Sequence, residues 1–284
     1  MAYYLVLMQF ILALIALFLL WRGWGRYRRM RLRKEIASTP FPERWREWLE
    51  RTPHYPMLSE PMRTELEREL RYFLTVKEFR GVGIGVTEEM RVGIAFYACL
   101  MVRGIPGECF DALQTLLIYP EPVWAEQVRE EGGIVSREEA LLDGQSSGDT
   151  LVFAWSEVEY EIYHHTPRNV VIHELAHVLD FEEGWVDGVP ELPPGEAQAW
   201  AEVNRRHFLR LRVRAEEALE SADLGEYEWI GEYAATSEVE FFAVLSERYF
   251  QVPRRLRESF PDLYGVYREY YGLDTAEIFG KLEE

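Results

Sequence analysis

The stretch from Val170 to Asp180 limits the fold more than any other part of the chain, because it places His173 and His177 four residues apart in an apolar run. On a helix, side chains four residues apart lie on one face, so both imidazoles can reach a single metal ion. Glu174 can then reach a water on the open side of that metal and act as general base. The pattern predicts a buried helix that carries two zinc ligands.

A third ligand must come from elsewhere, because a catalytic zinc site takes three protein ligands and leaves the fourth position for water. Without it, the motif describes only a helix whose two histidines cap a core. The one histidine after His177 is His207, which lies in a charged segment typical of a solvated surface. A carboxylate is therefore the expected third ligand.

Two glutamates, Glu240 and Glu247, are seven residues apart and so share one face of a predicted helix. Thr236 or Ser237 is placed to cap this helix. The residues after Glu240 are mostly apolar, and a carboxylate among them is costly to bury without a partner such as a metal. The alternative is that both glutamates are solvated.

The two segments together resemble the Mlc titration factor A family of zinc metallopeptidases, which is related at the active site to anthrax lethal factor. They read His-Glu-Leu-Ala-His-Val-Leu-Asp and Tyr-Ala-Ala-Thr-x-x-x-Glu-x-Phe-Ala-Val-Leu-Ser-Glu. The resemblance runs from about Phe41 to about Tyr271. It includes Leu117 to Pro120, Val152 to Trp155, Asn169, and Asp187 to Pro190.

The resemblance implies one Zn²⁺ per chain, held by His173, His177 and Glu240, with Glu174 as the base. Tyr233 matches a tyrosine that donates a hydrogen bond to the oxyanion in such enzymes. The implied activity is an aminopeptidase-like hydrolysis of a peptide or protein substrate. The best-known member of the family also binds a transcriptional repressor of sugar uptake, which implies a possible regulatory protein partner.

Several neighbouring residues are expected to support the site. Asp180 lies on the same helical face as His173 and could accept the other ring N–H of a ligand histidine or partner a nearby loop. Asn169 could cap the helix or hold the active-site loop. A predicted edge strand could pair with an extended substrate or be purely structural. Its residues are Val152, Phe153, Ala154 and Trp155.

The N-terminal run from Tyr3 to Trp21 is apolar and long enough to cross a bilayer as a helix. A cleaved secretory signal would need a basic segment before the run and a small-residue cleavage site after it, and neither is present. Cations instead follow the run, from Arg22 to Lys34, and such a bias keeps that side cytoplasmic. We expect a single-pass anchor in the inner (cytoplasmic) membrane, with the N-terminus outside and the catalytic domain inside.

The net charge of the chain limits the kinds of molecule that it can bind. With 49 acidic and 31 basic residues the chain has a net charge of -18, which repels nucleic acid, so direct nucleic-acid binding is not expected. Cys99 and Cys109 are expected to be reduced thiols without a metal role. His164 and His165 are expected in a solvated loop.

These patterns predict an α+β fold, mainly helical, with a small sheet and one preceding transmembrane helix, and the resemblance implies that the fold is zincin-like. Residues 1–34 are expected to form the anchor and its basic segment, and residues 35–284 the metallopeptidase domain. The alternative function is a membrane-tethered binding protein that sequesters a transcriptional regulator, with zinc structural or vestigial. A weaker one is a zinc hydrolase acting on something other than peptides.

Overall fold

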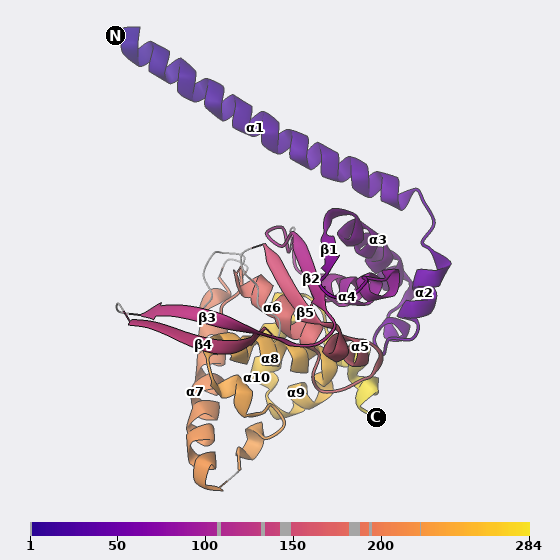
Figure 1. The fold of residues 1–284 in the computed structure, drawn as a ribbon, viewed down its shortest axis with the longest axis vertical. Coiled ribbons are helices and arrows are strands. Elements are labelled where there is room, and N and C mark those ends of the chain that lie inside the picture. The colour runs from indigo at the N-terminus through magenta and orange to yellow at the C-terminus, as the bar shows by residue number, and fades with distance from the viewer. Residues whose placement is uncertain are drawn as a thin grey trace.

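The computed structural model describes residues 2–106, 109–131, 134–142, 149–181, 188–192, 195–221 and 223–284. The sequence also predicts a turn at Gly144 to Asp149 and, from its Gly, Pro and acidic residues, a loop from Phe181 to Pro194. Both segments, with Asp187, lie largely outside the described residues. The helix α1 (Ala2–Ala37) is one long rod whose N-terminal part extends away from the rest of the protein, whereas its C-terminal part contacts α3 (Figure 1). It is long and apolar enough to cross a membrane, and the apolar part of it is not buried.

The remaining chain is mostly helical, as predicted, with strands confined to its middle part. In chain order the elements are α2 (Glu43–Leu49), η1 (Tyr55–Met57), α3 (Glu60–Val76), β1 (Glu78–Gly81), α4 (Glu88–Met101), β2 (Thr115–Tyr119), β3 (Val123–Glu131), β4 (Ile134–Leu142), β5 (Thr150–Ala154), α5 (Trp155–Tyr163), α6 (Val170–Phe181), α7 (Ala197–Ser221), η2 (Gly225–Tyr227), η3 (Glu232–Ala235), α8 (Glu238–Gln251), α9 (Pro253–Ser259), α10 (Pro261–Tyr271), α11 (Thr275–Phe279) and η4 (Gly280–Glu283).

The small sheet is parallel, with the strand order β1-β2-β5. Thr115 of β2 is in register with Glu78 of β1 on one side and with Thr150 of β5 on the other. The strands β3 and β4 form a separate antiparallel hairpin. Parallel strands need crossover connections, and the helix α4 supplies the one between β1 and β2.

Two apolar helices form the centre of the core. Thr87 caps α4, its hydroxyl accepting a hydrogen bond from the Met90 N–H, and α4 is buried from Val92 to Met101. The helix α8 is buried from Phe241 to Gln251. Because α6 packs against both α4 and α8, the motif helix lies inside the protein with one face toward α8.

Three local predictions were wrong. Trp155 is the first residue of α5 and does not belong to the strand, because β5 ends at Ala154. The aromatic-rich segment 260–282, which its sequence predicts to be one helix, is divided into α10, α11 and η4, since Gly272 adopts a left-handed conformation that ends α10. His207 is buried, and it pairs with Tyr227 and Asp262.

Candidate metal centre

The helix α6 is held at its N-terminus by Asn169. The Asn169 side-chain oxygen accepts a hydrogen bond from the Ile172 N–H at 3.1 Å, so the residue acts as the cap. The buried Asn169 N–H donates to the Glu247 carboxylate at 2.7 Å, which ties the start of α6 to α8. The predicted capping role of Asn169 is the one that the structure shows.

The helix α8 begins at Ser237, whose hydroxyl accepts a hydrogen bond from the Glu240 N–H at 3.1 Å. This cap fixes the first turn, and Glu240 lies in that turn. Glu247 follows two turns later on the same side, and both glutamates contact His173 on α6. The two helices therefore bring carboxylates and imidazoles together from segments about seventy residues apart.

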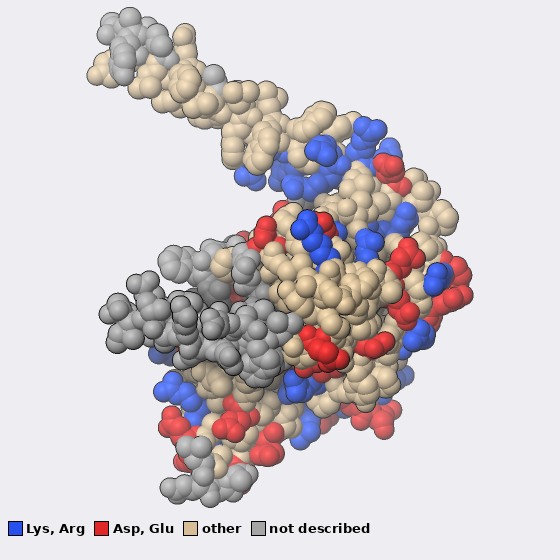
Figure 2. Space-filling view, viewed as in Figure 1, with Lys and Arg blue, Asp and Glu red and all other residues tan. Residues whose placement is uncertain are grey.

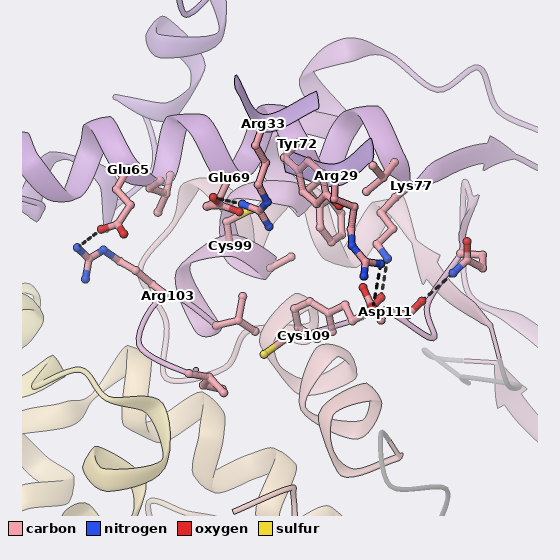
Figure 3. Close-up of a pocket in the computed structure, with 18 residues that line it drawn as sticks. Arg29, Arg33, Glu65, Glu69, Tyr72, Lys77, Cys99, Arg103, Cys109 and Asp111 are labelled. Atoms are coloured by element: carbon pink, nitrogen blue, oxygen red, sulfur yellow. Dashed lines mark hydrogen bonds and ion pairs between the residues drawn. The ribbon is translucent and has the colours of Figure 1, made fainter. Parts of the chain in front are cut away.

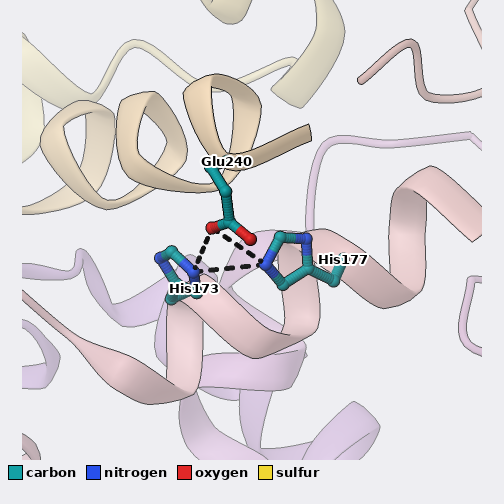
Figure 4. Close-up of side chains that lie close together, drawn as sticks. All are labelled: His173, His177 and Glu240. Carbon is teal, nitrogen blue, oxygen red and sulfur yellow. Dashed lines mark hydrogen bonds and ion pairs between the residues drawn. The ribbon is translucent and has the colours of Figure 1, made fainter. Parts of the chain in front are cut away.

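His173, His177 and Glu240 offer one ligand atom each, and these atoms lie within 4.8 Å of one another (Figure 4). The His173 Nε2 is 3.2 Å from the His177 Nε2 and 3.1 Å from the Glu240 Oε2, and the latter two atoms are 3.5 Å apart. Ligands about 2.0–2.1 Å from a tetrahedral zinc ion stand about 3.3 Å from one another. The spacing of this donor set fits one such ion.

The other ring nitrogen of His173 faces Glu247. The His173 Nδ1 lies 2.8 Å from the Glu247 Oε1, and both side chains are buried. When Nδ1 carries the proton and donates it to this carboxylate, Nε2 is left as the nitrogen with a free lone pair. Glu247 therefore orients the imidazole toward His177 and Glu240.

Charges around His173 follow from the same contacts. Without a metal ion, burial lowers the pKa of His173, but its hydrogen bonds with Glu240 and Glu247 outweigh burial and raise that pKa to about 10. A metal ion at this site would have to displace the proton on Nε2. Burial likewise raises the pKa of Glu240, but its contacts with His173 and His177 hold that pKa well below its usual range. Glu240 is therefore an anionic donor at neutral pH.

Glu174 is buried beside the donor set and lines a cavity of about 610 Å³. Tyr233 of η3 lies in the lining of the same cavity, with its ring centre 5.9 Å from that of His173. Tyr233 is 57 % exposed, so part of this residue faces solvent. The cavity thus combines a buried carboxylate and an exposed tyrosine with His173, which is the member of the donor set that its lining includes.

Asp180 supports the end of α6 through a loop. Its carboxylate accepts a hydrogen bond from the Gly188 N–H at 3.0 Å. Of the two roles predicted for Asp180, the structure therefore shows the contact with a nearby loop. The second ring nitrogen of His173 contacts Glu247 and not Asp180. Gly188 has φ +79°, and a Cβ there would lie 2.5 Å from the Glu238 carbonyl oxygen at the start of α8. A side chain at this position would separate the end of α6 from the start of α8.

The predicted substrate strand lies at one side of the parallel sheet. Val152, Phe153 and Ala154 belong to β5, which pairs with β2, and their side chains are buried. None of the three lines the cavity beside Glu174. Pairing of this strand with a substrate stays a prediction.

Two contributors were missed or left open from the sequence. Glu247 was recognised only through its spacing from Glu240, and its contact with His173 depends on how α6 and α8 pack. Arg248 lines the cavity, is buried, and donates to the carbonyl oxygens of Pro167, Trp229 and Ile230. These bonds hold the segments that precede α6 and Tyr233, and no local sequence pattern predicts them.

The remaining histidines of this region do not join the donor set. His164 stacks on the Tyr160 ring, and a ring nitrogen of His165 lies 2.6 Å from the Gln251 carbonyl oxygen. His54, which the sequence did not single out, is buried between the Phe250 carbonyl and the Tyr97 hydroxyl. Each of these rings has a structural partner. Cys99 and Cys109 are free thiols.

Comparisons with a family model and with individual proteins agree on one family for this chain. Residues 25–272 match the family described as Glucose-regulated metallo-peptidase M90. An uncharacterized protein of Synechocystis sp. is 32 % identical over 248 residues, which cover 85 % of this chain and 88 % of that protein. The Mlc titration factor A of Serratia proteamaculans is 32 % identical over 211 residues, covering 71 % and 76 %. That of Edwardsiella ictaluri is 33 % identical over 197 residues, covering 68 % and 72 %.

Proposed function

Because the chain belongs to the glucose-regulated metallopeptidase family M90, we propose that it is a peptidase that binds one zinc ion through His173, His177 and Glu240. The observation that carries this proposal is the spacing of the three donor atoms, which lie 3.1–3.5 Å apart, as ligands of one tetrahedral ion do. A zinc ion bound there supplies Lewis acidity that polarises a peptide carbonyl and lowers the pKa of a bound water.

The chain's own residues then have separate tasks. Glu174 takes the proton of the attacking water and passes it to the leaving amine. Tyr233 donates a hydrogen bond to the oxyanion that develops on the substrate carbonyl. Glu247 keeps the His173 ring in the orientation and tautomer that the donor set requires.

The proposed substrates are peptides cleaved at a free amino terminus. Support comes from the resemblance to an aminopeptidase-like family and from Glu232, which lines the cavity next to Tyr233 and offers a carboxylate to an amino group. An exposed carboxylate contributes specificity by charge complementarity. Short peptides and amino-acid amides are therefore the preferred first substrates.

We further propose that α1 anchors the protein in the inner membrane, with residues 35–284 as the peptidase domain in the cytoplasm. The helix has the length and apolar composition to span a membrane, and the cations beyond Trp21 favour a cytoplasmic location for the side that carries them. Figure 2 shows Lys and Arg gathered on the part of α1 nearest the domain.

The test uses the full-length chain in a mild detergent. Wild type is expected to hold close to one zinc per chain and to cleave peptides. Glu174→Gln is expected to lower kcat about 10²- to 10⁴-fold while the zinc content stays the same. Glu240→Ala is expected to lose zinc affinity, whereas Glu238→Ala, an exposed glutamate in the same turn of α8, serves as the matched control and keeps it. Unchanged zinc affinity in Glu240→Ala would show that another residue is the third ligand.

A second candidate function is supported by the names of the relatives. Proteins called Mlc titration factor A, at 32 % and 33 % identity, are named for titrating Mlc. The corresponding proposal is that this chain sequesters a regulatory protein at the membrane. Wild-type protein that binds zinc but cleaves neither peptides nor amides, together with partner capture that Glu174→Gln leaves intact, would favour this function over catalysis.

A further inference from the structure

A second cavity, of about 720 Å³, lies where α1 meets the rest of the protein. The C-terminal part of α1 forms one wall, α3 and the end of α4 form others, and the segment from Cys109 to Gln114 closes it (Figure 3). It shares no lining residue with the cavity beside Glu174. The site therefore needs an explanation separate from the metal centre.

The lining of this cavity is charged, with a small positive excess. Four cations and three acids contribute: Arg29, Arg33, Lys77 and Arg103 against Glu65, Glu69 and Asp111. Arg29 and Arg33 are one turn apart on α1 and reach Asp111 and Glu69 respectively (Figure 3). The excess of one positive charge suits a ligand with a single negative charge, and the acids disfavour a polyanion.

The deeper wall is apolar. Leu66 and Phe73 of α3, Ala98 of α4 and Phe110 line it, and all four are buried. An amphipathic ligand can therefore place its charged group against the arginines while its hydrocarbon part contacts this wall.

We propose that this cavity binds the phosphodiester headgroup of a monoanionic membrane phospholipid, an inference that rests on the proposed membrane placement of α1. Arg29 follows Trp21 by eight residues, about 12 Å along a helix, and the polar layer on each face of a bilayer is about 5–8 Å thick. A long arginine side chain spans the difference. The mouth of the cavity thus lies where headgroups are available.

The ion pairs in the lining do not block this ligand. The Arg33 and Glu69 side chains are 37 % and 44 % exposed, and pairs of this kind are weak. A phosphodiester offers two oxygens that match the planar guanidinium fork, so it competes well for the same donors.

The test measures lipid retention by native mass spectrometry of full-length protein, purified from membranes that contain phosphatidylglycerol and phosphatidylcholine. Wild type is expected to retain about one phosphatidylglycerol per chain. The double variant Arg29→Gln with Arg33→Gln is expected to retain at least tenfold less. Its matched control, Arg28→Gln with Arg31→Gln, removes the same charge from the same helix turns but outside this cavity, and is expected to retain the lipid.

Val102→Phe is a second test that leaves the charges unchanged, because Val102 lines the cavity and a larger ring there narrows it. It is expected to reduce retention as well, with an unchanged thermal transition. Equal loss in both double variants, or equal retention of phosphatidylcholine, would overturn the proposal. Displacement of the lipid by glycerol phosphate would assign the site to soluble phosphate esters. Extraction of the protein from membranes by carbonate would refute the membrane placement separately.

Discussion

Among the helix pairs at which carboxylates meet positively charged or protonatable side chains, α6–α8 and α1–α3 differ in the burial of those side chains. Between α6 and α8, the side chains of His173 and Glu247 are 11 % and 6 % exposed. Between α1 and α3, those of Arg33 and Glu69 are 37 % and 44 % exposed. At the first pair the Glu247 carboxylate also accepts the Asn169 N–H, whereas the second pair is open to water.

The difference shows why similar chemistry has different consequences in the two places. A buried carboxylate has given up its hydration and depends on its protein partners, so removing either side leaves an unpaired polar group. An exposed pair exchanges its partners for water or for another ion at little cost. We therefore expect the α6–α8 pair to fix geometry and the α1–α3 pair to remain available to a ligand.

The largest expected effect comes from Glu247→Ala in metal-free protein. The variant leaves the His173 Nδ1 and the Asn169 N–H without their acceptor inside the core. It should lower the free energy of unfolding by about 3–5 kcal/mol, the usual cost of breaking a buried pair. Denaturant titration measures it, with Glu69→Ala as the exposed counterpart. If the two variants differed by less than about 1 kcal/mol, the comparison between the regions would fail.

A second prediction separates burial from the charge of the partner. His54 is buried with no carboxylate among its hydrogen-bond partners in the described part of the chain, and burial, with a smaller contribution from His165, lowers the pKa of His54 from 6.5 to about 4. The carboxylates near His173 instead raise the pKa of His173. Because the unfolded chain binds a proton to His54 below pH 6.5 and the folded protein does so only below about pH 4, stability must fall as pH drops through this window.

Between pH 6.5 and pH 4, His54 is expected to lower the free energy of unfolding by about 3 kcal/mol. This loss is measured as the difference between wild type and His54→Gln in denaturant titrations at several pH values, since other groups titrate in both proteins. His54→Gln should lack this part of the pH dependence. Parallel curves for the two proteins would mean that His54 is not held neutral by burial.

The site predictions that depend on spacing along one helix agree with the structure. His173 and His177, four residues apart, share one face of α6, and Glu240 and Glu247, seven residues apart, both reach His173 from α8, as helical geometry predicts. Of the two predicted caps of α8, Thr236 and Ser237, the structure has Ser237. The mainly helical α+β class followed from the same periodicity.

Contacts between distant segments could not be predicted in this way. His207 lies among arginines in the sequence, yet Tyr227 and Asp262, 20 and 55 residues away, surround it in the fold. The partners of Arg248 are main-chain carbonyls, which every residue has, so no residue pattern marks them. The local sequence indicates which secondary structure a segment favours and which face of a helix a residue occupies. Whether a polar group is buried depends instead on tertiary packing.

The smallest expected effect belongs to the pair of Arg33 and Glu69. A double-mutant cycle with Arg33→Gln and Glu69→Gln, in full-length protein freed of lipid, should give a coupling energy of at most about 1 kcal/mol that shrinks further as salt is raised from 0.1 to 1 M. A coupling of several kcal/mol that salt does not change would mean that this pair behaves like a buried one. The α1–α3 seam would then be a rigid joint whose arginines are committed to the protein, and a phospholipid could not recruit them.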